Sequence, residues 1–179
     1  MQRKAFPFWR FALRIYGRTG VAPACLALQD ECGADVNLLL YCCWMGRRGK
    51  RLSRGDTRSA MTAIARWQDE VVAPLRQARR AIRNDPRGTA AAWAKYLRGR
   101  ISAAELDAEY VEQLILANAA AHIATPEGND QPREAAVANL HNYFARLGAA
   151  VNPRRARLLE TLVGGASLLG PPNVKQTPW

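Results

Sequence analysis

The chain has 179 residues, the size of one domain, and its content of 49% hydrophobic and 23% charged residues excludes an intrinsically disordered protein. Its formal net charge of +11 favours an anionic partner, namely an acidic protein, nucleic acid or an acidic lipid surface. It contains neither an apolar run long enough to cross a bilayer nor a secretion signal, so we expect a cytoplasmic protein with reduced cysteines and no transmembrane segment.

The net charge is unevenly distributed along the chain. Residues 1–100 carry 20 basic and 7 acidic groups, a net charge of +13. Residues 101–135 carry 1 basic and 7 acidic groups, a net charge of −6. The sequence therefore predicts a basic N-terminal half opposed by an acidic segment.

No stretch alternates apolar and polar residues over the length of a strand, so we predict an all-α fold. Helices are expected at about 8–16, 23–33 and 36–45, the last of them capped by Asp35. Residues 36–45 are apolar on nearly every side, which is typical of a helix in the centre of a fold. We predict a bundle of about six to eight helices around it, with one domain over 1–165 and an irregular tail over 166–179.

A basic loop is expected from Gly46 to Gly55, followed by a long helix that Asp56 or Thr57 caps. The apolar residues of this helix recur at steps of three and four: Ile64, Trp67, Val71, Leu75, Ala78 and Ile82. Pro74 should kink the helix, and residues 84–86 should end it.

Two helices are predicted in the next segment. Thr89 should cap a short one through Trp93, Tyr96 and Leu97, and Ser102 with Glu105 forms a capping-box pattern that opens a second one toward Ile123. Further helices are expected at about 133–147 and 153–163, and residues from Gly164 onward are expected to be irregular.

The most ordered polar pattern is a row of arginines at helical spacing. Its members are Arg76, Arg79, Arg80 and Arg83. With Arg47 and Arg48 from the basic loop they could form an anion-binding surface, because guanidinium groups bind phosphate well. The alternative is pairing with the acidic residues of a neighbouring antiparallel helix, which are Glu105, Glu109 and Glu112.

A second candidate is a ligand site beside the apolar helix. Its predicted residues are Asp30, Asp35, Asn37 and Trp67. The tripeptide Gln-Asp-Glu occurs at 29–31 and again at 68–70, and facing carboxylates on helices can hold Mg²⁺ and, through it, a diphosphate. The alternative is that these residues are helix caps and surface charges.

Other polar and sulfur-containing residues give weaker patterns. The cysteines, Cys25, Cys32, Cys42 and Cys43, lack the paired spacing of a zinc site, so we expect them in the core. His122 and His141 are expected on polar helix faces. No nucleophile, phosphate-loop or dinucleotide motif is present, so the sequence predicts no catalytic residue, metal or cofactor.

The first predicted helix is rich in aromatic residues: Phe6, Phe8, Trp9, Phe11 and Tyr16. With Arg10 and Arg14 it could lie on a membrane surface. The alternative is a core helix whose basic side faces solvent.

Residues 8–16, 25–30 and 33–40, together with the stretch LQDECGADVNLLLYCCW at 28–44, resemble an uncharacterised family of proteobacteria whose members are of about this length and contain a domain of unknown function. The resemblance is clearest over residues 8–46. The resemblance is looser from Trp67 to Arg83. It implies a bacterial cytoplasmic setting and supplies no activity, cofactor or site residue.

Three functions remain open at this point. The first is a non-enzymatic binding or accessory protein that engages an anionic partner through an arginine-rich face. The second is a small-ligand or Mg-diphosphate site bordered by Asp30, Asp35 and Asn37. The third is a structural or oligomerising helical protein.

Overall fold

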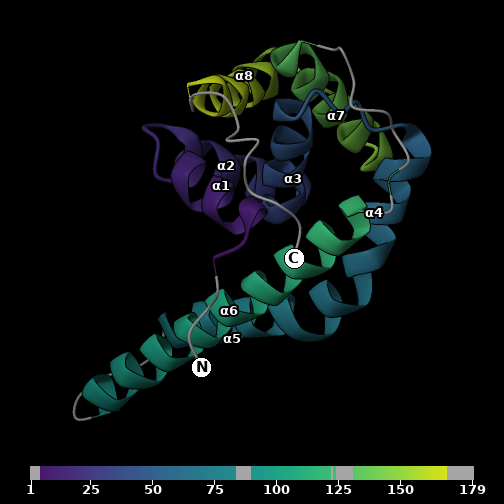
Figure 1. Ribbon diagram of the computed structural model, residues 1–179. Coiled ribbons are helices and arrows are strands. Elements are labelled where there is room, and N and C mark those ends of the chain that lie inside the picture. The colour runs from purple at the N-terminus through teal and green to yellow at the C-terminus, as the bar shows by residue number, and fades with distance from the viewer. Residues whose placement is uncertain (1–4, 84–89, 122, 124–130, 169–179) are drawn as a thin grey trace.

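The computed structural model describes residues 5–83, 90–121, 123 and 131–168 (Figure 1). Within these residues every regular element is a helix, which confirms the predicted all-α fold. The elements are α1 (Pro7–Tyr16), α2 (Val21–Cys32), α3 (Val36–Arg47), α4 (Arg54–Trp67), a π-helical turn η1 (Gln68–Val72), α5 (Ala73–Arg83), α6 (Ala90–Ala121), α7 (Pro132–Arg146) and α8 (Pro153–Ser167).

Helix α3 is the centre of the bundle, as its apolar sequence predicts. All residues from 37 to 46 are buried, and the helix packs against α1, α2, α6, α7 and α8. Asp35 caps it, because its side chain accepts a hydrogen bond from the Leu38 N–H at 2.9 Å. The burial of a helix on all sides follows from apolar residues on all sides.

Helices α3 and α7 approach each other very closely at Gly46. A Cβ atom at this position would lie 2.3 Å from the backbone of Ala136, so only glycine fits. Asn139, also on α7 and fully buried, accepts a hydrogen bond from the Leu52 N–H and donates to the carbonyl oxygens of Cys42 and Lys50. These contacts fix the loop after α3 against α7.

The long helix after this loop starts at Arg54, earlier than predicted. Its cap is Ser53, which forms a reciprocal capping box with Asp56, so the prediction of Asp56 or Thr57 as the cap is wrong. The predicted irregularity at Pro74 takes the form of the π-helical turn η1, which directly precedes α5. Proline has no N–H for the helical ladder, and the wider turn accommodates it. The predicted end at 84–86 lies outside the described residues.

Helix α6 is one continuous helix of 32 residues, so the prediction of two helices is wrong. Ser102 and Glu105 lie inside it, and Ser102 caps nothing because the alanine-rich sequence before it is itself a good helix former. Helix α8 also extends beyond its predicted end to Ser167. Gly165 lies within it against Val21, where a Cβ would come within 2.7 Å of the valine side chain.

The helices form a body from which one end of α6 projects (Figure 1). Helices α1, α2, α3, α7 and α8 lie together, α4 passes along one side, and α5 returns against α6. The N-terminal turns of α6 extend away from this body. Among the described residues, none of the helices has the combination of length and apolar character needed to span a membrane.

Candidate functional site

Two arginines of the predicted row form ion pairs with α6. Arg76 contacts Glu105 at 3.3 Å and Glu109 at 3.2 Å, and Arg79 donates to both carboxylate oxygens of Glu105. Burial alone would raise the pKa of Glu105, but the hydrogen bonds and charges of Arg79 and Arg76 outweigh it and hold this pKa below its ordinary value. The predicted pairing between the arginine row and the acidic helix therefore exists for these residues.

The other predicted anion-binding residues are separately engaged. Arg80 pairs with Asp30 on α2 at 3.2 Å, both side chains being more than half exposed. Arg47 donates to the carbonyl oxygen of Ala166 at 3.1 Å, and Arg48 lies 4.9 Å from the centre of the Trp44 ring. The side chain of Arg83 is outside the described part of the structure. The predicted anion-binding surface stays a prediction, and its described arginines already have protein partners.

The predicted ligand residues do not converge on one place. Asp30 is exposed on α2, and Trp67 donates its indole N–H to the carbonyl oxygen of Ala108 at 2.9 Å. Asp35 and Asn37 are buried at the start of α3, with exposed fractions of 9% and 4%. Only these last two belong to a common cluster.

Asn37 is the centre of a buried polar cluster with α6. It donates to Glu112 at 2.9 Å and accepts from Gln113 at 2.7 Å. The backbone N–H of Asp35 donates to the Tyr143 hydroxyl at 2.7 Å, which ties α7 into the same region. Neither Gln113 nor Tyr143 was among the predicted site residues. The signal for Gln113 is that the polar pair Glu112 and Gln113 interrupts an apolar run on α6.

Two carboxyl groups meet in this cluster. Burial and then the charge of Asp35 raise the pKa of Glu112 to about 9, and burial raises the pKa of Asp35. Among the described residues, Glu112 Oε1 and Gln113 Oε1 have no hydrogen-bond partner. Both pKa shifts have the same direction, because a proton on either carboxyl removes one of two neighbouring buried charges.

The cysteines lie where the core prediction places them. Cys25, Cys42 and Cys43 are buried and Cys32 is half-buried, all as free thiols. Burial raises the pKa of Cys25 and of Cys42 to about 12, so neither is a reactive thiolate. In the described ranges no group of three or more His, Cys, Asp and Glu side chains is placed to hold a metal ion. His141 is exposed, and His122 is not described.

The aromatic residues of α1 are core residues. Phe6, Phe8, Trp9 and Phe11 are all buried, and the Phe8 ring stacks on Trp44 with centroids 4.9 Å apart. Helix α1 is therefore a packed helix whose arginines face outward, the alternative to a membrane-surface helix.

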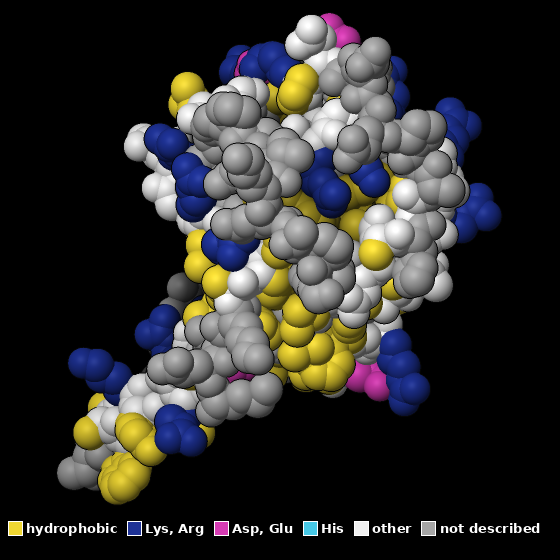
Figure 2. Space-filling model, in the orientation of Figure 1, with side chains coloured by type: hydrophobic (Ala, Val, Ile, Leu, Met, Phe, Trp, Pro, Cys, Tyr) yellow, Lys and Arg dark blue, Asp and Glu magenta, His cyan; other side chains and the backbone are white. Residues whose placement is uncertain are grey.

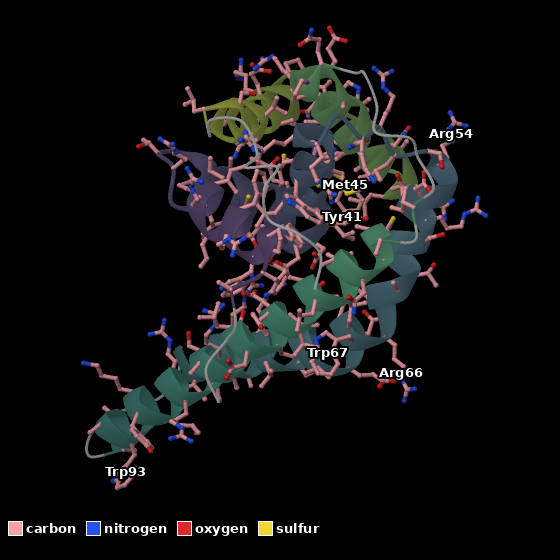
Figure 3. The ribbon with its side chains drawn as sticks, in the orientation of Figure 1. Tyr41, Met45, Arg54, Arg66, Trp67 and Trp93 are labelled. Atoms are coloured by element: carbon pink, nitrogen blue, oxygen red, sulfur yellow. The ribbon has the colours of Figure 1, made fainter. Side chains whose placement is uncertain are left out.

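Large apolar side chains are exposed instead at the projecting end of α6. We call residues 90–100 the projecting turns; all of them are exposed except the half-buried Ala94. Trp93, Tyr96 and Leu97 are 75%, 58% and 50% exposed, and the rings of the first two meet edge to face with centroids 5.9 Å apart. Figure 3 shows Trp93 at the far end of the helix, pointing away from the body, whereas Tyr41 and Met45 lie inside it.

The same turns carry basic residues. Lys95, Arg98 and Arg100 are exposed and form no ion pair with any residue that the structure describes, and residues 90–104 include no acidic residue. Figure 2 shows hydrophobic and basic side chains next to each other along this end. The sequence revealed the apolar spacing of Trp93, Tyr96 and Leu97, but their exposure is a property of the tertiary structure.

The comparisons with known proteins identify a family and no function. Residues 7–116 match the family model "Protein of unknown function (DUF2390)". This range includes the buried polar residues of α3 and α6 and the whole of the projecting turns, and it ends before α7. No curated protein and no solved structure matches the chain. The predicted resemblance to an uncharacterised family is confirmed, and the chain belongs to this family of proteins of unknown function.

Proposed function

We propose that this protein is a non-enzymatic binding protein, and that it engages an anionic partner through the projecting turns of α6. The observation that supports the proposal is the difference between two sets of basic residues. Arg76 and Arg79 are matched by glutamates. Lys95, Arg98 and Arg100 have no such match in the described structure. The proposal therefore moves the binding surface from the predicted arginine row to the end of α6.

Electrostatics favours this location. The whole chain carries +11, so an anionic partner is attracted from a distance, and unpaired cations on a protruding helix are the first groups that it reaches. A paired arginine would have to give up a glutamate before it could bind a new anion. We keep the expected cytoplasmic setting, which the free cysteines support.

Heparin is a suitable first probe for this proposal, because it presents dense negative charge without an apolar surface. The test variant is Lys95→Glu, Arg98→Glu and Arg100→Glu together. The matched control reverses three exposed arginines elsewhere, Arg54, Arg58 and Arg146, and so changes the net charge equally.

We expect the test variant to lose about tenfold or more in heparin affinity at low salt, and the control to lose much less, because local charge outweighs net charge at short range. Affinity should also fall as salt is added. Equal losses in the two variants would show that binding is nonspecific attraction to a basic protein, and the proposal would be wrong.

The buried cluster supports a second candidate, a small-ligand site at Asp35, Asn37 and Glu112. The favouring observation is the pair of unpartnered oxygens on Glu112 and Gln113, since a buried acceptor is costly when it has no donor. Gln113 Oε1 is an acceptor, and Glu112 Oε1 becomes one when that carboxyl loses its proton, so the ligand would be a donor such as an amine, or a divalent cation, whose binding releases the Glu112 proton.

Calorimetric titration with Mg²⁺ and with ethylamine tests this candidate. Binding that disappears in Glu112→Gln and persists in Asp69→Asn, an exposed residue of the second Gln-Asp-Glu tripeptide, would support it. Absence of binding by the intact protein would remove it.

A further inference from the structure

We propose that the anionic partner is a lipid bilayer, and that the projecting turns insert Trp93, Tyr96 and Leu97 into its interface while Lys95, Arg98 and Arg100 contact the headgroup phosphates. This inference rests on the proposed function and adds the chemistry of the partner. It explains why the same turns combine exposed aromatic side chains with cations that form no ion pair in the described structure.

The exposed side chains are of the types that favour a membrane interface. Tryptophan and tyrosine have an apolar ring with a polar edge, and they concentrate at the level of the headgroups. Trp93 and Tyr96 expose most of their surface, and no described residue covers them. Leu97 adds a purely apolar side chain, and Arg and Lys can extend from an apolar surface to the phosphates.

Helical geometry orders these residues by depth. Trp93, Tyr96 and Leu97 share one face, because they are spaced by three and four residues. Arg100 lies on the same face about 10 Å further along the axis toward the body, at a rise of about 1.5 Å per residue. Interfacial helices bury their apolar face by about 5–10 Å. A tilted α6 thus places Trp93 at the boundary between headgroups and acyl chains when Arg100 is at the phosphates.

Other occupants of this surface fit the observations less well. A second copy of the chain would bring together two molecules of charge +11, and the glutamates of α6 that could compensate are buried or paired with α5. A soluble polyanion such as nucleic acid satisfies the cations but provides no apolar phase for Leu97 and the Trp93 ring. Phe8, Trp9 and Phe11 of α1 are buried in the core and do not compete for this role.

Vesicle co-sedimentation of the full chain tests the inference. The probes are vesicles of phosphatidylcholine alone, and vesicles of equal parts phosphatidylcholine and phosphatidylglycerol. We expect binding to the anionic vesicles only. The variant Trp93→Ala, Tyr96→Ala and Leu97→Ala should bind them at least about tenfold more weakly while its heparin affinity is unchanged, because insertion depends on apolar area and heparin offers none.

Two matched variants complete the test. Leu13→Ala with Leu26→Ala removes other exposed leucines and should bind the anionic vesicles like the wild type. Brominated acyl chains should quench the tryptophan fluorescence of the wild type, and Trp93→Phe should lose most of this quenching while still binding.

The possible results separate the two proposals. The insertion would be overturned, and the proposed function left intact, by two results together. The charge-reversal variant of Lys95, Arg98 and Arg100 would lose binding to vesicles and to heparin, and the variant with alanine at Trp93, Tyr96 and Leu97 would bind vesicles fully. A dimer in sedimentation velocity that dissociates in the triple alanine variant would also overturn it, because the apolar face would then be covered by a second copy. No binding to either probe by the intact chain would overturn both proposals.

Discussion

The two halves of α6 have the same backbone conformation and opposite surroundings. Residues 90–104 contain three basic residues and no acidic one, and their large side chains are exposed except that of the half-buried Ile101. Residues 105–121 contain four acidic residues and no basic one; Glu105 and Glu112 are buried and Glu109 is half-buried. The acidic half has its partners in the same chain: Arg76 and Arg79 on α5, and Asn37 at the start of α3.

This difference separates charges that hold the protein together from charges that are available to a partner. The glutamates near α5 and α3 are largely withdrawn from water, so changing their partners should alter stability. The cations of the projecting turns are exposed and form no ion pair in the described structure, so changing them should alter binding and leave stability nearly the same.

The largest expected effect comes from placing the same substitution in the packed core and in the projecting turns. Gly46→Ala in α3 would force a Cβ against the Ala136 backbone, and we expect a loss of about 4 kcal/mol in the free energy of unfolding, or failure to fold. Gly99→Ala in the projecting turns meets no atom within 4 Å and should stabilise the helix by about 0.5–1 kcal/mol. Urea denaturation measures both. Equal effects would mean that the two regions are equally packed.

The next effect concerns charge. Arg76→Gln should destabilise the protein by about 3 kcal/mol, because it leaves Glu105 and Glu109 without their shared cation in a mostly buried position. Arg98→Gln, in the exposed half, should change the free energy of unfolding by no more than about 0.5 kcal/mol. A large loss in Arg98→Gln would reveal an intramolecular partner for the projecting turns and weaken the proposed function.

The buried carboxyl pair predicts a dependence of stability on pH. The pKa of Glu112 is about 9 in the folded protein against an ordinary value of 4.5, so the folded state holds a proton that the unfolded state has released. Its stabilising contribution is complete below about pH 4.5 and is lost as pH rises toward 9.

We therefore expect the free energy of unfolding to fall by about 1 kcal/mol per pH unit between pH 6 and 8. Glu112→Gln should flatten this slope, because the amide is neutral at every pH. A wild-type curve that is already flat over this range would show that Glu112 is ionised in the folded protein. Charge changes in the projecting turns should leave the slope as it is.

The smallest expected effect on stability is that of Trp93→Ala. The side chain is 75% exposed, so little packing is lost, and the free energy of unfolding should change by no more than about 0.5 kcal/mol. Its thermal midpoint should match that of the wild type within about 2 °C. A drop of several degrees would mean that Trp93 packs against the protein in solution.

Local patterns predicted the centre of the fold well. Asp35 as a cap and the buried helix after it follow from residue types at fixed spacing, and both are present. The same kind of rule failed at Ser102, where the capping pattern occurs inside a continuing helix. A capping box shows where a helix could start, and the helix-forming residues before Ser102 decide that it does not start there.

The candidate sites were harder to predict because they depend on which helices meet. The acidic row was correctly considered as a partner of the arginine row, but the contact of Glu112 with Asn37 requires the exact placement of α6 beside α3. Trp93 and Trp67 both have helical spacing typical of core residues. Trp67 contacts Ala108 of α6, whereas Trp93 is 75% exposed, a difference that depends on how the helices pack.

Hydrogen exchange along α6 tests the central claim most directly, because one experiment reports on both halves. In the free protein we expect rapid exchange for residues 90–100, which are exposed except for the half-buried Ala94, and slow exchange for 105–121. Adding vesicles of phosphatidylcholine and phosphatidylglycerol should protect residues 90–100 and leave 105–121 unchanged. Equal protection of both halves in the free protein, or no gain at residues 90–100 with vesicles, would contradict the account.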